Sequence, residues 1–170
     1  RSATNPVTIN LAEGSVTDGT AALPGGTSQG KDTLRGVESI EGTRYDDVYN
    51  AQDFSRFSKN GGGDEAGFYG QNNTYKPLGG NDIVTGNGYT YLSYESAKVG
   101  IYADLEAGFV DALGQDKLSV ETRPAVLTGQ DYLYTVGRTT FTDVVGIEGS
   151  DYADYLKGGA SDNGEGYSGI

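Results

Sequence analysis

Two segments of the chain place an Asp at the same point behind a Gly-led turn. They read IEGTRYDDVYN at 40–50 and IEGSDYADYLK at 147–157, so that Asp47 aligns with Asp154 without gaps. Gly lets a backbone turn tightly, and carboxylate and carbonyl oxygens are the ligands that hard divalent cations prefer. The chemistry that these residues predict is cation binding by acidic turns, present twice in one chain.

The repeated block extends upstream of both acidic segments. VTINLAEGSV at 7–16 and IYADLEAGFV at 101–110 share Leu, Gly and Val at the same spacing. The upstream blocks lie 94 residues apart (105 − 11), whereas the acidic segments lie 107 residues apart (147 − 40). The second copy therefore carries about a dozen extra residues, which we place in an inserted loop or hairpin near 112–138. Internal similarity with an insertion at one place is typical of solenoids.

Short β-type pieces fill the rest of the chain. No window shows apolar residues at helical spacing. Pieces of about three to five residues, such as NDIVT, YTYLSY and DYLYTV, are bounded by Gly, Asn or Asp. This pattern favours an all-β chain wound into a coil, a single solenoid-like domain over 1–170 with related units of about 5–98 and 99–170. A small antiparallel sandwich or jelly roll is the alternative.

The composition narrows the classes of function. Gly supplies 28 of the 170 residues and Pro only 4, which indicates many tight turns. The net charge of −12 argues against a nucleic-acid partner, because phosphate binding needs a basic surface. His and Cys are both absent, so the commonest general base and the usual zinc ligands are missing. No apolar run is long enough for a membrane helix, and we expect no membrane insertion.

Three stretches together resemble the haemolysin-type calcium-binding repeats of RTX proteins, in the degenerate form found in large secreted bacterial proteins. They are DTLRGVESIEGTRYDD at 32–47, GGNDIVTGNGYTYLSYESAKVGIYADLEAGFV at 79–110 and GIEGSDYADYLKGGASDN at 146–163. The resemblance implies a right-handed parallel β-roll or β-helix with irregular turns. In such arrays, stacked turns share Ca²⁺ through Asp carboxylates and backbone oxygens.

The resemblance implies Ca²⁺ as the cofactor and assigns the candidate metal ligands turn by turn. The same acidic side chains could instead cap nearby backbone N–H groups within their turns. That alternative stays open at this stage. The candidate ligands are Gly42, Asp46, Asp47, Gly79, Gly80, Asn81, Asp82, Gly149, Asp151, Asp154, Gly158 and Asp162.

The function implied by the resemblance is structural. We expect a calcium-stabilised extracellular repeat module of a larger bacterial surface protein or exoprotein, secreted by a type I system. Because the chain begins at Arg1 and contains no Met, we expect an excerpt or a processed piece of a longer chain. Calcium ions, polysaccharide and neighbouring repeats of the same protein are the expected partners. We predict no enzymatic activity, because a repeated acidic motif suits a structural turn better than a catalytic site.

Two other functions fit the sequence. Tyr89, Tyr91 and Tyr94 alternate in YTYLSY and are expected to share one face of a strand. Such a face could stack against sugar rings in a carbohydrate-binding or adhesin module. The plainer interpretation is that large rings fill a thin core. The chain could also be the non-catalytic repeat tail of a secreted hydrolase or lyase.

Overall fold

The computed structural model describes residues 5–18, 30–61, 70–113 and 136–158. Every regular element in these ranges is a β-strand, which confirms the all-β expectation for the described part of the chain. No described helix is long and apolar enough to cross a membrane. The strands are β1 Val7–Asn10, β2 Ser15–Asp18, β3 Lys31–Thr33, β4 Ser39–Glu41, β5 Val48–Asn50, β6 Asn73–Lys76, β7 Ile83–Ser93, β8 Ile101–Asp104, β9 Phe109–Ala112, β10 Thr139–Glu148 and β11 Tyr155–Lys157.

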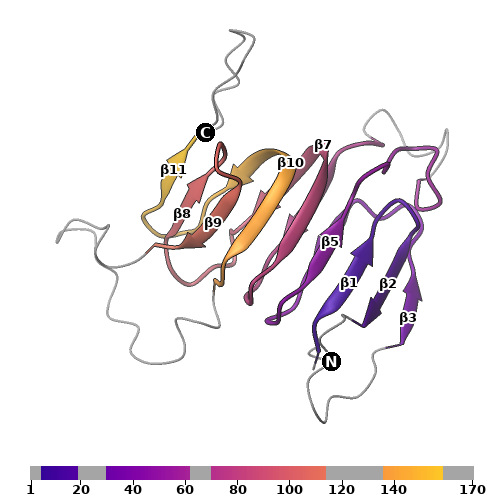
Figure 1. Cartoon of the computed structure of the whole chain (residues 1–170), viewed down its shortest axis with the longest axis horizontal. Helices are drawn as coiled ribbons and strands as arrows, with labels where there is room; N and C mark the ends of the chain where they lie inside the picture. The colour runs from indigo at the N-terminus through magenta and orange to yellow at the C-terminus, as the bar shows by residue number, and fades with distance from the viewer. Residues whose placement is uncertain (1–4, 19–29, 62–69, 114–135, 159–170) are drawn as a thin grey trace, which may run out of the picture.

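The strands form one mixed sheet in which they lie side by side along the long axis of the molecule (Figure 1). The order is β11-β8-β9-β10-β7-β5-β1-β2-β3, with β4 and β6 joined to the side of β7. Strand β5 runs parallel to both β1 and β7, and β7 runs parallel to β10. The pairs β1–β2, β2–β3, β8–β9 and β9–β10 are antiparallel. The sheet is therefore not the purely antiparallel one of a simple sandwich.

Parallel register stacks side chains from successive strands in two rows. Strands β7 and β10 are long enough to contribute to both rows. The beginning of each strand pairs in the first row, and its end pairs in the second. The Tyr49 and Tyr75 rings, one from each row, stack with their centroids 4.6 Å apart. The rows therefore meet in a core of aliphatic and aromatic side chains. The first row is Ile9, Tyr49, Val84 and Phe141, and the second is Ile40, Tyr75, Leu92 and Ile147.

The upstream blocks of the repeat fold into two matching hairpins. Strands β1 and β2 pair in the same register as β8 and β9, with each partner shifted by 94 residues. Gly14 and Gly108 close the two turns with φ of +67° and +71°, a region that Gly enters at little cost. Strand β2 pairs with β3 as β9 pairs with the start of β10. The extra residues of the second copy thus fall between β9 and β10.

Most of the expected insertion near 112–138 lies outside the described residues, which stop at 113 and resume at 136. The piece DYLYTV also falls almost wholly within that gap. The division into units of about 5–98 and 99–170 stays a prediction.

Two expectations about the segment 83–94 were wrong. NDIVT and YTYLSY do not form separate short strands, because β7 runs unbroken from Ile83 to Ser93. Tyr89 and Tyr91 are half exposed, but Tyr94 is only 1% exposed and lies in the core. Tyr94 lies three residues after Tyr91, so a period of two places it on the opposite face, with buried Thr90 and Leu92.

Candidate functional site

The predicted ligands lie in three turns that precede parallel strands. One turn leads into β5, one into β7 and one into β11. Asp47 and Asp82 are each 1% exposed, whereas Asp46 and Asn81 are at the surface. The structure brings the first two turns into direct contact, since the Asp46 carboxylate accepts a hydrogen bond from the Asn81 N–H at 2.7 Å. The third turn lies at the far end of the sheet, next to β8.

The Asp47 carboxylate is held by four donors. Oδ1 accepts hydrogen bonds from the Val7 N–H at 2.8 Å and from the Thr43 hydroxyl at 2.9 Å. Oδ2 accepts from the Thr43 N–H at 2.5 Å and from the Tyr75 hydroxyl at 3.3 Å. The side chain therefore closes its own turn and ties that turn to β1 and β6. This is the capping role that the sequence left open for Asp47.

Asp154 repeats this arrangement in the second copy. Its Oδ1 accepts from the Ile101 N–H at 2.8 Å and from the Ser150 hydroxyl at 2.7 Å, and Oδ2 accepts from the Ser150 N–H at 2.8 Å. Each partner of Asp47 in the turn and in the neighbouring hairpin has an equivalent. The exception is Tyr75, which has no counterpart among the described partners of Asp154. Asp154 is less buried than Asp47.

Asp82 joins its turn to the Asp47 turn through one carboxylate oxygen, whereas its other oxygen has no described partner. Its Oδ1 accepts a hydrogen bond from the Asp47 N–H at 2.9 Å. Its Oδ2 is buried and has no hydrogen-bond partner within the part of the chain that the structure describes. On the far side, the Asn81 side-chain oxygen accepts from the Arg138 N–H at 3.2 Å. The turn at 79–82 thus connects β5 with the start of β10.

Burial controls the protonation of the two inner carboxyls. Burial raises the pKa of Asp82 to about 8, opposed by the Asp47 N–H and reinforced by the negative charges of Asp47 and Asp46. Burial also raises the pKa of Asp47, although the hydrogen bonds from Thr43, Val7 and Tyr75 oppose the shift. The pKa of Tyr75 is raised well above its usual value, chiefly by burial and then by Asp82 and Asp47.

The raised pKa of Asp82 determines the direction in which the stability of the folded chain changes with pH. The Asp82 pKa is about 8 in the folded chain and close to its usual value in the unfolded one. Between those values the folded chain binds more protons than the unfolded chain. The contribution of Asp82 to stability is therefore complete at acidic pH and is lost as the pH rises toward 8.

The predicted glycines have different roles. Gly80 adopts φ of +82° against the backbone of Tyr45 and Asp46, and a Cβ on Gly42 or Gly149 would collide with the carboxylate of its own turn. Gly79 is buried. Gly158 is exposed, and a Cβ there would meet nothing within 4 Å. Gly42, Gly80 and Gly149 therefore serve close packing of the turns.

The remaining predicted ligands do not join these clusters. Asp151 is exposed, and Asp162 lies outside the described residues. Within the described ranges, no three or more Asp and Glu side chains gather closely enough to hold a metal ion. The predicted ligands Asp46, Asp47, Asp82 and Asp154 instead accept hydrogen bonds from backbone N–H groups, and Asp47 and Asp154 accept from hydroxyls as well.

Three side chains that donate hydrogen bonds to these carboxylates were not predicted from the sequence. Thr43 and Ser150 each contribute a hydroxyl and an N–H to the carboxylate four residues later. Their match in the aligned segments could have identified them, because a Gly-Thr/Ser-x-x-x-Asp spacing recurs in both copies. Tyr75 had no such signal, since its contact with Asp47 spans 28 residues and depends on the stacking of β6 beside β4.

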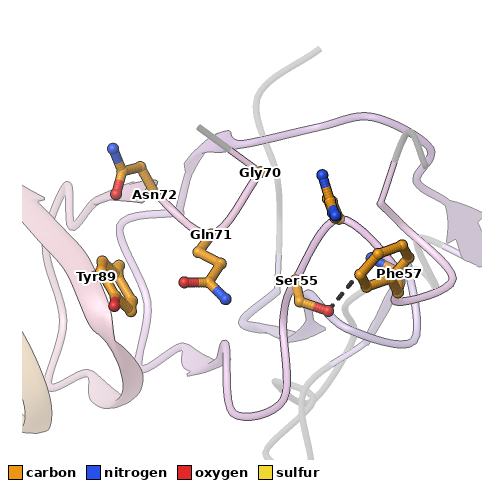
Figure 2. Close-up of a pocket in the computed structure, with 7 residues that line it drawn as sticks. Ser55, Phe57, Gly70, Gln71, Asn72 and Tyr89 are labelled. Atoms are coloured by element: carbon orange, nitrogen blue, oxygen red, sulfur yellow. Dashed lines mark hydrogen bonds between the residues drawn. The ribbon is translucent and has the colours of Figure 1, made fainter. Parts of the chain in front are cut away.

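A separate cleft of about 560 Å³ lies away from these turns, between the loop after β5 and the start of β6 (Figure 2). Two exposed rings, Tyr89 and Phe57, stand on opposite sides of it. The Arg56 guanidinium lies 4.5 Å from the centre of the Phe57 ring, and the Ser55 hydroxyl accepts a hydrogen bond from the Phe57 N–H. Among the described residues, the lining also includes Gly70, Gln71 and Asn72.

No protein-family model matches the chain, and neither a curated protein nor a solved structure matches it. A functional proposal for this protein rests on its own geometry and on the resemblance of its motifs.

Proposed function

We propose that the chain is a structural repeat module whose coils are closed and joined by Asp-centred turns. The observation that carries this proposal is the duplication of one turn with its partners. Asp47 and Asp154 each accept bonds from the residue four positions earlier and from the first strand of the preceding hairpin. A binding or catalytic site needs to occur only once, whereas a turn that closes coils recurs with each coil. The proposed role is therefore non-catalytic.

The finer architecture belongs to the same proposal. Two rows of parallel strands connected by Gly-rich turns are what a wound β-roll presents on its two sides. The chain passes from one row to the other through the turns of Asp47 and Asp154, each of which follows a strand of the second row. We propose a right-handed solenoid on this basis. The extracellular location at a bacterial cell surface is proposed from the RTX resemblance alone.

We place calcium at one position, Asp82. Among the described candidate ligands, this buried side chain has an oxygen to which a cation can bind without displacing a hydrogen bond. Exposed Asp46 lies in the adjoining turn of Asp47, and its negative charge acts on the Asp82 carboxyl. Two carboxylates suit a weak site, of the about 10⁻⁴–10⁻³ M affinity usual for extracellular modules. Without calcium, burial favours the protonated, neutral form of Asp82. Bound calcium would instead neutralise the ionised carboxylate.

Asp82→Asn is expected to remove both responses of the chain to its surroundings. In EGTA, the wild-type stability should fall from about pH 5 to 8 more steeply than that of the variant, by up to about 1.4 kcal/mol per pH unit. At pH 7.5, millimolar calcium should raise the melting temperature of the wild type but not of the variant. Thermal melts followed by circular dichroism measure both effects.

Asp154→Asn is the matched control, because the Asp154 carboxylate already has three donors. It should keep the calcium response of the wild type. A wild type that melts at the same temperature in calcium and in EGTA would contradict the calcium site and leave the structural proposal standing. Loss of β-structure in EGTA alone would show that the turns need metal.

The cleft in Figure 2 supports a second candidate function, carbohydrate binding. Tyr89 is 50% exposed and Phe57 73% exposed, and the Gln71 side chain lies between them in Figure 2. Flat apolar rings flanked by amides are suited to stack on sugars and bond their hydroxyls.

Tyr89→Ala is expected to abolish retention on an array of bacterial and algal polysaccharides. Tyr152→Ala removes a ring that is 42% exposed in the turn of Asp154, away from the cleft, and should bind as the wild type does. Equal retention by both variants, or no retention by the wild type, would contradict this second function.

A further inference from the structure

Strands β5 and β11 are equivalent in the repeat but differ in one respect. Strand β5 is paired on both edges, with β1 on one side and β7 on the other. Strand β11 is paired only with β8 within the described part of the chain, and it ends the sheet (Figure 1). One edge of β11 therefore lacks the neighbour that β5 has.

The paired edges of the two strands match residue by residue. Strand β11 meets β8 as β5 meets β1, with Leu156 in the place of Tyr49. The Lys157 carbonyl accepts from the Leu105 N–H at 3.0 Å, as the Asn50 carbonyl accepts from the Leu11 N–H at 2.8 Å. Since neighbouring residues of a strand direct their backbone groups to opposite sides, the backbone of Leu156 points away from β8.

In the first copy, β7 pairs with the corresponding edge, and further hydrogen bonds flank this ladder at both ends. The Asp82 carboxylate accepts from the Asp47 N–H, and the Asp47 carbonyl accepts from the Ile83 N–H at 3.0 Å. The Thr85 carbonyl accepts from the Ala51 N–H at 2.7 Å. A strand preceded by a carboxylate is therefore what this edge binds.

The exposure of the β11 side chains also indicates that this edge can accept a further strand. Tyr49 is fully buried in the first copy, whereas its equivalent Leu156 is 41% exposed. The neighbouring Tyr155 is 56% exposed. An unpaired edge with large exposed apolar side chains is a template for a further strand.

We propose that the open edge of β11 binds a partner polypeptide segment of the β7 type, a Gly-Gly-Asn-Asp turn followed by a strand. The segment runs parallel to β11, with its first two strand residues opposite Tyr155 and Leu156, as Ile83 and Val84 stand opposite Val48 and Tyr49. The Asp carboxylate of the bound segment accepts a hydrogen bond from the Asp154 N–H. This interaction is β-strand addition, and it rests on the structural role proposed above.

A second copy of this chain does not offer such a segment. Its own β7 lies between β5 and β10, and its Asp82 is 1% exposed. Since no described segment of a second copy is free to pair there, the proposal assigns the occupant to a strand of a partner polypeptide.

The test uses the whole chain in EGTA and a synthetic peptide with the sequence of 78–93, LGGNDIVTGNGYTYLS. Circular dichroism of the chain alone first establishes that it is folded. Titration calorimetry should then give one peptide per chain, with backbone amide shifts confined to Asp154–Gly158. A peptide with Ala in place of the Asp should bind about tenfold more weakly or worse, because a charge-assisted hydrogen bond is lost.

Leu156→Pro removes the outward N–H and should abolish binding, while an edge position of this kind tolerates Pro in the folded chain. Leu156→Ala is its matched control, since it keeps that N–H and should still bind.

No binding, or binding that Leu156→Pro leaves intact, would overturn the proposal. Concentration-dependent dimers without peptide would also overturn it, in favour of direct pairing between copies. If the chain lacks β-structure in EGTA, the titration is repeated in millimolar calcium, and a chain without β-structure there as well would contradict the structural role instead.

Discussion

Asp47→Ala is expected to lower the free energy of unfolding by at least about 3 kcal/mol, and the melting temperature by roughly 6–12 °C. The substitution leaves two backbone donors, the Val7 and Thr43 N–H groups, without their acceptor in a buried place. Each buried donor left unpaired costs about 1–3 kcal/mol. The Thr43 and Tyr75 hydroxyls lose their partner as well, although both can rotate toward other groups. Urea denaturation followed by circular dichroism gives the loss.

Asp154→Ala is the matched comparison, because the chain carries the same turn in a more exposed setting. Water can reach the donors that it frees, so we expect a loss of only about 1 kcal/mol. Both variants remove one negative charge from a chain of net charge −12, so relief of general repulsion is the same in each. Equal losses would show that burial of the Asp47 turn contributes nothing to its strength.

Gly80→Ala is expected to be the most damaging glycine substitution that we propose, with a loss of about 2–5 kcal/mol. Two effects add. The φ of +82° is unfavourable for any residue with a Cβ. The added Cβ would also lie 2.7 Å from the Asp46 nitrogen and closer still to the Tyr45 carbonyl, and backbone atoms cannot rotate away.

Gly88→Ala isolates the first of these effects. Gly88 has almost the same φ, +79°, but a Cβ there would meet nothing within 4 Å. Its loss should be about 1–2 kcal/mol, the cost of the left-handed conformation alone. The difference between the two variants measures the close approach of the turn at 79–82 to the turn of Asp47. Equal losses in urea denaturation would show that the two turns are not in contact.

Local patterns in the sequence were informative where the structure depends on neighbours along the chain. The all-β class followed from short β-rich pieces between Gly, Asn and Asp, and the strands are there. The repeat also located the added residues of the second copy. They lie after the hairpin, because β1–β2 and β8–β9 share one register. The expected Tyr face was wrong at Tyr94, because Tyr94 lies three residues after Tyr91 and a period of two places it on the opposite, buried face.

The roles of the acidic residues depended on contacts far along the chain. Nothing local tells whether Asp47 meets a cation or an N–H group, because its Val7 partner is 40 residues away. The same holds for Asp82, whose partner Asp47 is 35 residues away. Parallel stacking of coils supplies these donors, and only the folded chain shows which oxygens they reach.

By itself, the sequence determined that this protein is all-β, acidic, rich in turns and built from a repeated Asp-bearing block. These properties follow from composition and short spacings, which act within a few residues. The tertiary structure alone decided that Asp47 and Asp154 bind backbone donors, that Asp82 has a buried oxygen without a described partner, and that β11 pairs on only one edge among the described strands. Those outcomes arise from pairing between segments tens of residues apart, where register and burial set the partner of each polar atom.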